Sequence, residues 1–212
     1  SNIGPFAFEN CIGITSITIP SGVIGNFVFS GCSELASVVF GNSVTVIGEA
    51  ALQGCSKITT VTIPNSLISI GSQAFKDCTG LTSITISNSV ISIGDQAFRN
   101  CTGLTSIAIP ASVKSIGENA FRDCAGLTSI TIPNGVTNIG DWAFFDCSGL
   151  TEIAIPNSVT SIGEAAFFGC SKLVSVSIPD SVTTISENTF NDCEELTSVI
   201  IPGSITDIGD WA

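Results

Sequence analysis

Nine cysteines are the side chains in this sequence with the greatest potential for chemistry. A thiolate can act as a nucleophile or bind a metal ion, and two thiols can form a disulfide. Nucleophilic catalysis usually needs a neighbouring base, and the sequence contains no histidine. Zinc sites need closely spaced Cys or Cys/His pairs, and the sequence has no Cys-x-x-Cys. These residues predict no catalytic thiol, no metal site and no cofactor.

The spacing of the cysteines indicates a structural role instead. Successive cysteine numbers differ by 23 from Cys32 onward (for example 124 − 101), and by 21 at the first step (32 − 11). One cysteine at the same place in every repeat is typical of a small buried residue. Neighbouring side chains in such a column point in parallel, which is unfavourable for the dihedral angle of a disulfide. We therefore expect free, buried thiols at Cys11, Cys32, Cys55, Cys78, Cys101, Cys124, Cys147, Cys170 and Cys193.

The carboxylates form a second column, because an acidic residue follows the turn glycine, or its equivalent, in most repeats. Its members are Glu49, Asp95, Glu118, Asp141, Glu164, Glu187 and Asp210. Such a column could bind calcium, which prefers oxygen ligands. The favoured alternative is repeated capping at the start of a helical turn. The net charge of −12 argues against a nucleic-acid partner.

The elements that position these columns can be read from one repeat, "LTSIAIPASVKSIGENAFRDCAG", residues 104–126. Its first part has apolar residues at Leu104, Ile107 and Ile109, and the last two alternate with a small residue. This pattern predicts a short strand with one buried face. Pro110 ends that strand because proline has no backbone donor for a sheet. The piece "VKSIG" then predicts a second short extended segment before a glycine turn.

The last part of the repeat, "GENAFRDC", predicts a short helical turn. Ala120 and Phe121 lie four and three residues before Cys124, a spacing that places all three on one side of a helix. A repeat of this size cannot bury its apolar side chains alone, but stacked repeats can. A fixed period in the twenties therefore predicts one solenoid of about nine rungs across residues 1–212. The sequence begins and ends inside a repeat, so we expect a segment of a longer array, truncated mid-repeat at both ends.

The repeat Leu-x-x-Ile-x-Ile-Pro-x-Ser-Val-x-x-Ile-Gly-x-x-Ala-Phe-x-x-Cys resembles the BspA-like class of leucine-rich repeats, found in bacterial surface proteins and in some protists. The resemblance implies a parallel sheet on the concave side, with short helices or extended turns on the convex side and flank. It also implies a cell-surface or secreted location, an intracellular one being the alternative, and adhesion or binding of a host protein.

Two surfaces are candidates for binding. The outward positions of the predicted strands carry short hydroxyl side chains and one charge, at Ser83, Thr85, Ser106, Ser129, Thr131 and Glu152. Leucine-rich repeats commonly bind on that face, although binding hot spots favour larger side chains. The second surface lies on the flank, where Phe145 and Phe168 continue the column of Lys76, Arg99 and Arg122, and where we expect Trp142 to be exposed. Local packing, including an Arg122–Phe145 cation–π contact, is the structural alternative.

The sequence leaves three classes of function open. The favoured one is a non-catalytic protein-binding or adhesion scaffold whose partner is a protein, such as a host or matrix protein. A passive spacer or stalk is the alternative, and glycan or ice binding by the Ser/Thr-rich face is a minor one. No apolar run is long enough to span a bilayer, so we expect no membrane insertion. Exposed end rungs at Ile3 and Ile208 predict weak end-to-end self-association.

Overall fold

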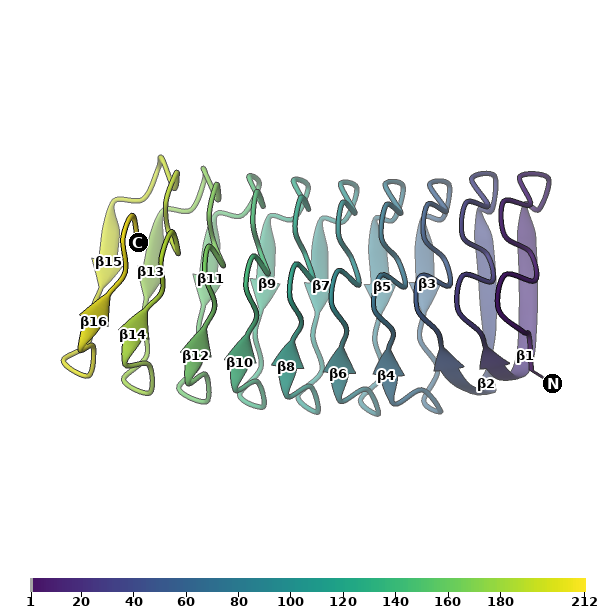
Figure 1. Ribbon diagram of the computed structural model, residues 1–212, viewed down its shortest axis with the longest axis horizontal. Coiled ribbons are helices and arrows are strands. Elements are labelled where there is room, and N and C mark those ends of the chain that lie inside the picture. Colours follow the sequence, from purple (N-terminus) through teal and green to yellow (C-terminus); the bar gives the residue numbers. More distant parts are fainter. Residues whose placement is uncertain (1) are drawn as a thin grey trace.

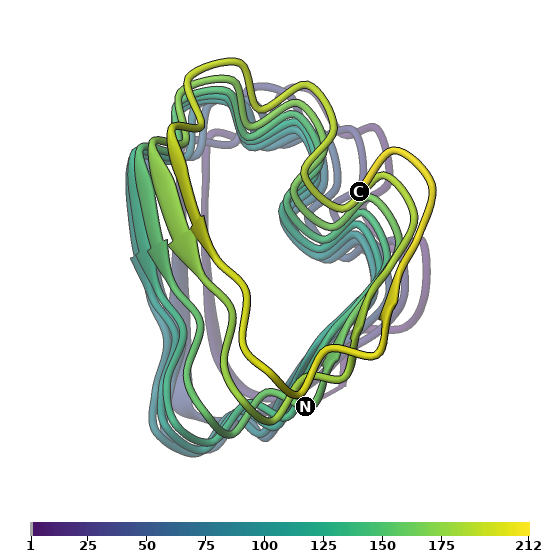
Figure 2. The same cartoon turned by 90° about the vertical axis from the view of Figure 1, so that its left-hand side faces the viewer.

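The computed structural model describes residues 2–212 and is a parallel β-solenoid of about eight full turns. The rungs follow one another along a single axis, and the two termini lie toward opposite ends of it (Figure 1). The predicted repeat solenoid is thus confirmed. Viewed along the axis, each rung encloses the interior between two extended segments and a folded turn-rich segment (Figure 2).

Two sets of strands run along the solenoid. The first extended segments of rungs three to nine are β3 (Thr60–Thr62), β5 (Ser83–Thr85), β7 (Ser106–Ala108), β9 (Ser129–Thr131), β11 (Glu152–Ala154), β13 (Ser175–Ser177) and β15 (Ser198–Ile200). The second segments are β4 (Ser69–Ile70), β6 (Ser92–Ile93), β8 (Ser115–Ile116), β10 (Asn138–Ile139), β12 (Ser161–Ile162), β14 (Thr184–Ile185) and β16 (Asp207–Ile208). In the first two rungs both segments merge into β1 (Ser16–Ile24) and β2 (Ser37–Ile47).

Every strand pair is parallel and joins equivalent positions of neighbouring rungs. The second segments form one sheet in the order β1-β2-β4-β6-β8-β10-β12 and a separate β14-β16 pair. The first segments form the ladders β3-β5 and β7-β9-β11-β13-β15. Ser106 pairs with Ser129 and Ile107 with Ile130, so like residues stack. Because side chains alternate along a strand, the isoleucines point inward and the serines outward, as the pattern predicts.

The interior is built from stacked columns, of which the largest is a column of phenylalanine rings. Rings of Phe75, Phe98, Phe121, Phe144 and Phe167 have neighbouring centroids 5.3–5.5 Å apart and lie within 8° of parallel. All five are fully buried. Leu52 takes the same place one rung before Phe75 and is also fully buried. The column therefore supplies a continuous apolar core, while tolerating one smaller side chain.

The predicted helical turn is wrong, because none of the described residues 2–212 lies in a helix. In the segment 117–124 only alternate amides bond locally: Ala120 N donates to Gly117 O, and Arg122 N to Asn119 O. The amides between them donate to the next rung, as from Phe121 N to Ala143 O at 2.8 Å. The segment is thus a series of turns, since a helix would use every amide internally and leave the next rung unpaired.

Backbone conformation at two positions in this segment also excludes a helix. The residue five before each cysteine and the residue one before it are left-handed, with φ of 54° at Asn119 and 62° at Asp123. The second column contains only Asn, Asp and Gly, the residues that adopt this conformation most readily. The first column accepts even Trp142, with φ of 53°. Stacking on both neighbouring rungs holds this otherwise unfavourable backbone in place.

The acidic column has a different structural role from the one predicted. No helix is present in the described chain for these residues to cap. Instead, Asp95 Oδ1 accepts a hydrogen bond of 2.9 Å from the backbone N–H of Glu118 in the next rung. Asp141 Oδ1 accepts in the same way from Glu164 N–H at 2.9 Å. The short acidic side chains therefore connect one rung to the next.

A serine ladder ties successive turns together after the first strand of each rung. Ser89 Oγ donates to Leu67 O at 2.7 Å, and Ser112 Oγ to Val90 O at 2.5 Å. The same bond recurs from Ser181 to Val159 O and from Ser204 to Val182 O. The ladder is interrupted in rungs 127–149 and 150–172. Gly135 has no hydroxyl, and the buried Ser158 Oγ has no hydrogen-bond partner.

Candidate functional site

The cysteine column is structural, and its thiols have low nucleophilic reactivity. All nine cysteines are free, as their spacing predicts, and seven of them are buried, whereas Cys11 and Cys193 in the end rungs are only partly buried. Each thiol from Cys32 onward donates to the carbonyl of a residue in the preceding rung, such as Cys124 Sγ to Phe98 O at 3.1 Å. Burial raises the pKa of the Cys55 and Cys124 thiols to about 12. Nucleophilic thiolate is therefore scarce at neutral pH.

The flank cluster, defined as Arg122, Trp142, Phe145 and Phe168, places three aromatic side chains and one cation together on the outer surface. The Arg122 guanidinium carbon lies 4.3 Å from the centroid of the Phe145 ring. The rings of Phe145 and Phe168 stack at 4.7 Å and within 5° of parallel. The structure therefore confirms the expected cation–π contact and brings three of the four residues into one stack across consecutive rungs.

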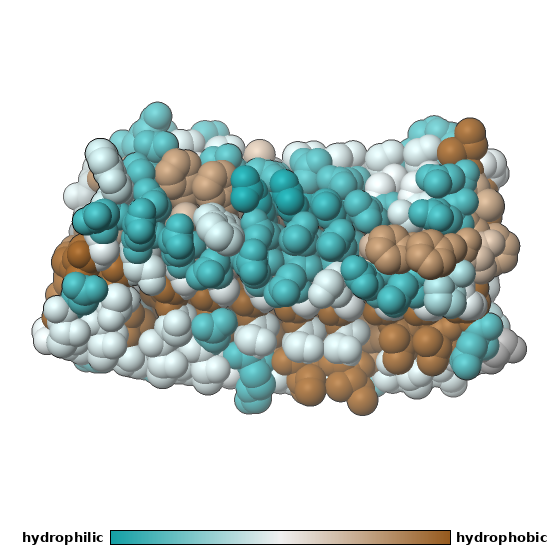
Figure 3. All heavy atoms as spheres, in the orientation of Figure 1, coloured by the Kyte–Doolittle hydropathy of each residue, from teal (hydrophilic) through white to brown (hydrophobic). Residues whose placement is uncertain are grey.

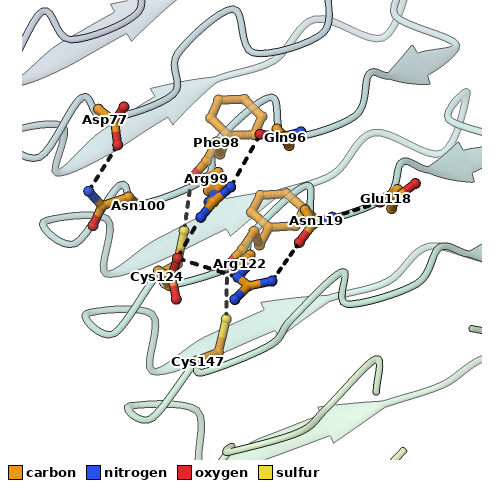
Figure 4. A network of polar contacts seen from close by, with 12 residues as sticks. Asp77, Gln96, Phe98, Arg99, Asn100, Glu118, Asn119, Arg122, Cys124 and Cys147 are labelled. Atoms are coloured by element: carbon orange, nitrogen blue, oxygen red, sulfur yellow. Dashed lines mark hydrogen bonds and ion pairs between the residues drawn. The ribbon is translucent and has the colours of Figure 1, made fainter. Parts of the chain in front are cut away.

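Polar neighbours fix the orientation of the two guanidinium groups in this column. Arg122 Nη1 donates to Asn119 Oδ1 at 3.2 Å, and Arg99 Nη1 donates to Gln96 Oε1 at 3.4 Å. Both Nε atoms lie 3.5–3.6 Å from Asp123 Oδ2. Figure 4 shows the two arginines side by side, each beside its amide partner. The Arg122 side chain is about 30% exposed, so this network preorganises a half-buried cation.

Trp142 is half-buried rather than fully exposed, in contrast to Trp211 in the same column, which is 77% exposed. Its carbonyl accepts the backbone N–H of Phe145 at 3.1 Å, so both residues belong to one turn of the rung. On the face that carries the second strands and the turn-rich segments, hydrophilic residues gather over the upper part, and apolar residues show as a broken band along the lower part (Figure 3).

A carboxylate column lies beside the cluster and gives a stability prediction. Burial and then the neighbouring Asp123 carboxylate raise the pKa of Asp146. Asn100 occupies the same position two rungs earlier, and its Nδ2 donates to Asp77 Oδ1 at 2.9 Å. Asp146→Asn should therefore raise the free energy of unfolding at neutral pH by a few tenths to about 1 kcal/mol.

The sign of this effect follows from the direction of the pKa shift. The pKa of the Asp146 carboxyl is higher in the folded than in the unfolded chain, where it is about 3.9. Ionisation of Asp146 therefore lowers the free energy of unfolding as the pH rises above that value. The gain should accordingly disappear in acid. Asp192→Asn is the comparison and should gain less, because Gly169 precedes it in the column and its carboxylate is the weakest of the influences on the pKa of Asp146. Urea unfolding at both pH values measures the effect, and an unchanged or lower stability of Asp146→Asn at neutral pH would contradict it.

The Ser/Thr face, defined as the outward side chains of β3, β5, β7, β9, β11 and β13, has the expected exposure. The six predicted residues Ser83, Thr85, Ser106, Ser129, Thr131 and Glu152 are all exposed, and the isoleucine between each outward pair is buried. A shallow hollow is lined by Ser129, Thr131, Glu152, Ala154 and Ser175. The face belongs to the first strands, whereas the flank cluster belongs to the turn-rich segments, so the structure does not bring the two candidate surfaces together.

The sequence predicts that neighbouring carboxylates, Asp123 among them, balance the arginine charges, and the structure places Asp123 between Arg99 and Arg122. Sequence reasoning missed Asn119, which is only 6% exposed and accepts a hydrogen bond from Arg122. Among residues 2–212, no three Cys, Asp or Glu side chains are placed to hold one metal ion. The same residues contain no helix long and apolar enough to cross a membrane.

Known proteins share both the sequence pattern and the fold. A family model described as a BspA type leucine-rich repeat region matches residues 1–127 and 91–212, which together span the chain. A leucine-rich repeat protein from Bacteroides ovatus is 29% identical with a TM-score of 0.76, and the match covers 100% of this chain and 67% of that one. No curated protein matches.

Two further solved structures are similar. A leucine rich cell surface protein from Faecalibacterium prausnitzii is 30% identical with a TM-score of 0.63, over 95% of this chain and 76% of that one. A leucine-rich repeat protein from T. pallidum is 25% identical with a TM-score of 0.59, over 98% and 77%. The family match covers every rung, and the structure has the corresponding parallel solenoid. The chain belongs to the BspA-type leucine-rich-repeat family.

Proposed function

We propose that this chain is a non-catalytic protein-binding scaffold at the cell surface, with the flank cluster as its recognition site. The observation that carries the proposal is the preorganised stack of Arg122, Phe145 and Phe168 across three consecutive rungs. Arginine and aromatic side chains dominate the energetics of protein interfaces. Groups already held in one orientation lose little entropy when a partner binds.

Three large aromatic side chains, Trp142, Phe145 and Phe168, lie in the adjacent rungs 127–149 and 150–172, which supports a local site there. In the rungs before them, residues 50–126, the same two columns carry alanine or polar and charged residues, and the other aromatic members of these columns, Phe6, Phe27 and Trp211, lie near the two ends of the chain. A passive spacer has no requirement for such a concentration. The cell-surface location is supported by family membership and by the Faecalibacterium prausnitzii relative, described as a cell surface protein.

The test returns the cluster to residues that other rungs use at the same positions. Trp142→Asn copies Asn119, Phe145→Gln copies Gln53, and Phe168→Asn copies Asn191. The triple variant should fold as the parent does, yet lose binding by at least about 2 kcal/mol, because hot-spot truncations cost that much. The measurement is surface plasmon resonance against a panel of immobilised matrix and cell-surface proteins.

The control for this experiment removes an aromatic residue far from the cluster. Phe6 and Phe27 form another stacked pair, with centroids 5.1 Å apart, in the first rungs. Phe27→Asn should bind as the parent does. If the triple variant keeps full affinity, recognition lies outside the flank cluster, and if the parent binds no protein in the panel, the spacer function gains support.

A further inference from the structure

One turn of the solenoid differs chemically from its equivalents in the other rungs. The turn between β9 and β10 reads Pro133-Asn134-Gly135-Val136, whereas the equivalent turns at Asn65 and Asn157 read Pro-Asn-Ser-Leu and Pro-Asn-Ser-Val. Asn134, Asn65 and Asn157 are all exposed. The three turns are closed by the same bond, from Val136 N to Pro133 O at 3.1 Å and from the equivalent amides at 3.0 and 3.1 Å. Residue type, rather than turn geometry, therefore distinguishes this site.

The same turn also lacks the serine hydrogen bonds that link the equivalent turns to neighbouring rungs. In other rungs a serine hydroxyl at the position of Gly135 donates to the preceding rung, as Ser112 does to Val90 O. Gly135 cannot make that bond, and Ser158 of the following rung has an unpartnered Oγ and does not donate back to rung 127–149. The Asn157 turn, in contrast, is tied from the next rung by Ser181 Oγ on Val159 O. The Asn134 turn should open more readily because it lacks both ties.

We propose that Asn134–Gly135 is a site of spontaneous deamidation. In the open turn, the backbone nitrogen of Gly135 attacks the amide carbon Cγ of Asn134. A bond forms between these two atoms, the bond from Cγ to Nδ2 breaks, and ammonia leaves with the amide proton, giving a five-membered succinimide. Water then hydrolyses either carbonyl of the ring and yields aspartate or isoaspartate. The absence of a side chain on Gly135 removes the steric obstacle that Ser66 and Ser158 place beside the attacking nitrogen.

The product alters the turn that links the two sheets. Each conversion adds a carboxylate, and the isoaspartate form also adds a methylene to the backbone. A Cβ atom at Gly135 would already approach Ala111 O to 2.2 Å, so the backbone here has little free space. Val136, the next residue, is fully buried. We expect the isoaspartate form to unfold at a lower temperature than the parent.

The experiment incubates the intact protein at mildly alkaline pH and follows each asparagine by peptide mapping and mass spectrometry. Asn134 should convert several-fold faster than Asn65 and Asn157, which serve as controls within the same molecule. Gly135→Ser should reduce the rate at Asn134 to theirs. Ser158→Gly/Ser181→Ala, which leaves Gly135 in place and removes the hydrogen bond from Ser181 to Val159 O, should create a second fast site at Asn157. Equal rates at the three asparagines of the parent, or an unchanged rate at Asn157 in this double variant, would overturn the proposal.

Discussion

Truncating one ring in the middle of the phenylalanine column, Phe121→Ala, should lower the free energy of unfolding by about 3–5 kcal/mol. Phe121 is fully buried, and its ring stacks at 5.4 Å on both Phe98 and Phe144. The substitution leaves a cavity in a column whose backbone positions are fixed by hydrogen bonds to the neighbouring rungs. Because those bonds hold the spacing, collapse around the cavity is limited, and the loss should lie toward the upper end of the range.

Phe121→Leu is the matched control, since Leu52 occupies the same position in another rung. It should cost clearly less than Phe121→Ala, because most of the apolar volume is retained. Urea unfolding followed by circular dichroism gives both values. A cost for Phe121→Ala no greater than that for Phe121→Leu would mean that the stacked rings contribute little to the core.

A steep loss of stability in alkali is the second large effect that we expect. Burial raises the pKa of the Cys55 and Cys124 thiols to about 12, whereas the pKa of an exposed thiol is about 8.5. The unfolded protein therefore releases protons that the folded protein retains. The contribution of the buried thiols to the free energy of unfolding is complete below about pH 8.5. It falls as the pH rises toward about 12, by about 1.4 kcal/mol per pH unit for each buried thiol.

Seven buried thiols act together, so the loss should exceed that of an ordinary protein over the same interval. The measurement is the free energy of unfolding by urea at several pH values between neutrality and about pH 10. Removing three of the thiols, in Cys101→Ala/Cys124→Ala/Cys147→Ala, should make the slope against pH shallower, whatever its effect on stability at neutral pH. Equal slopes for the parent and this variant would show that thiol ionisation does not control unfolding.

The repeat columns could be predicted from the sequence because each side chain meets its own kind in the next rung. Ile107 and Ile130, or Cys101 and Cys124, are buried for the same reason at each recurrence. The turn-rich segment could not be predicted from apolar spacing alone. Ala120, Phe121 and Cys124 share one side in a helix and are also buried together in the observed series of turns, so the pattern does not separate the two structures.

Hydrogen bonding between rungs decides between those structures. A helix would keep the Phe121 amide within the segment, whereas the solenoid directs it to Ala143 of the next rung. The left-handed residues Asn119 and Asp123 make this possible. The candidate site was predictable only in part. The stack of Arg122, Phe145 and Phe168 follows from their shared column, but the half-burial of Trp142 depends on turn geometry that its spacing does not encode.

Recognition by the flank cluster is tested most directly by comparing two variants against one captured protein partner. The first is the triple variant Trp142→Asn/Phe145→Gln/Phe168→Asn, and the second is Glu152→Ser, which restores the serine column of the Ser/Thr face. Isothermal titration calorimetry on both, after urea unfolding has verified their stability, separates the two surfaces. We predict that the triple variant loses binding while Glu152→Ser keeps the parent affinity. Full affinity in the triple variant, with weakened binding by Glu152→Ser, would contradict the account and place recognition on the Ser/Thr face.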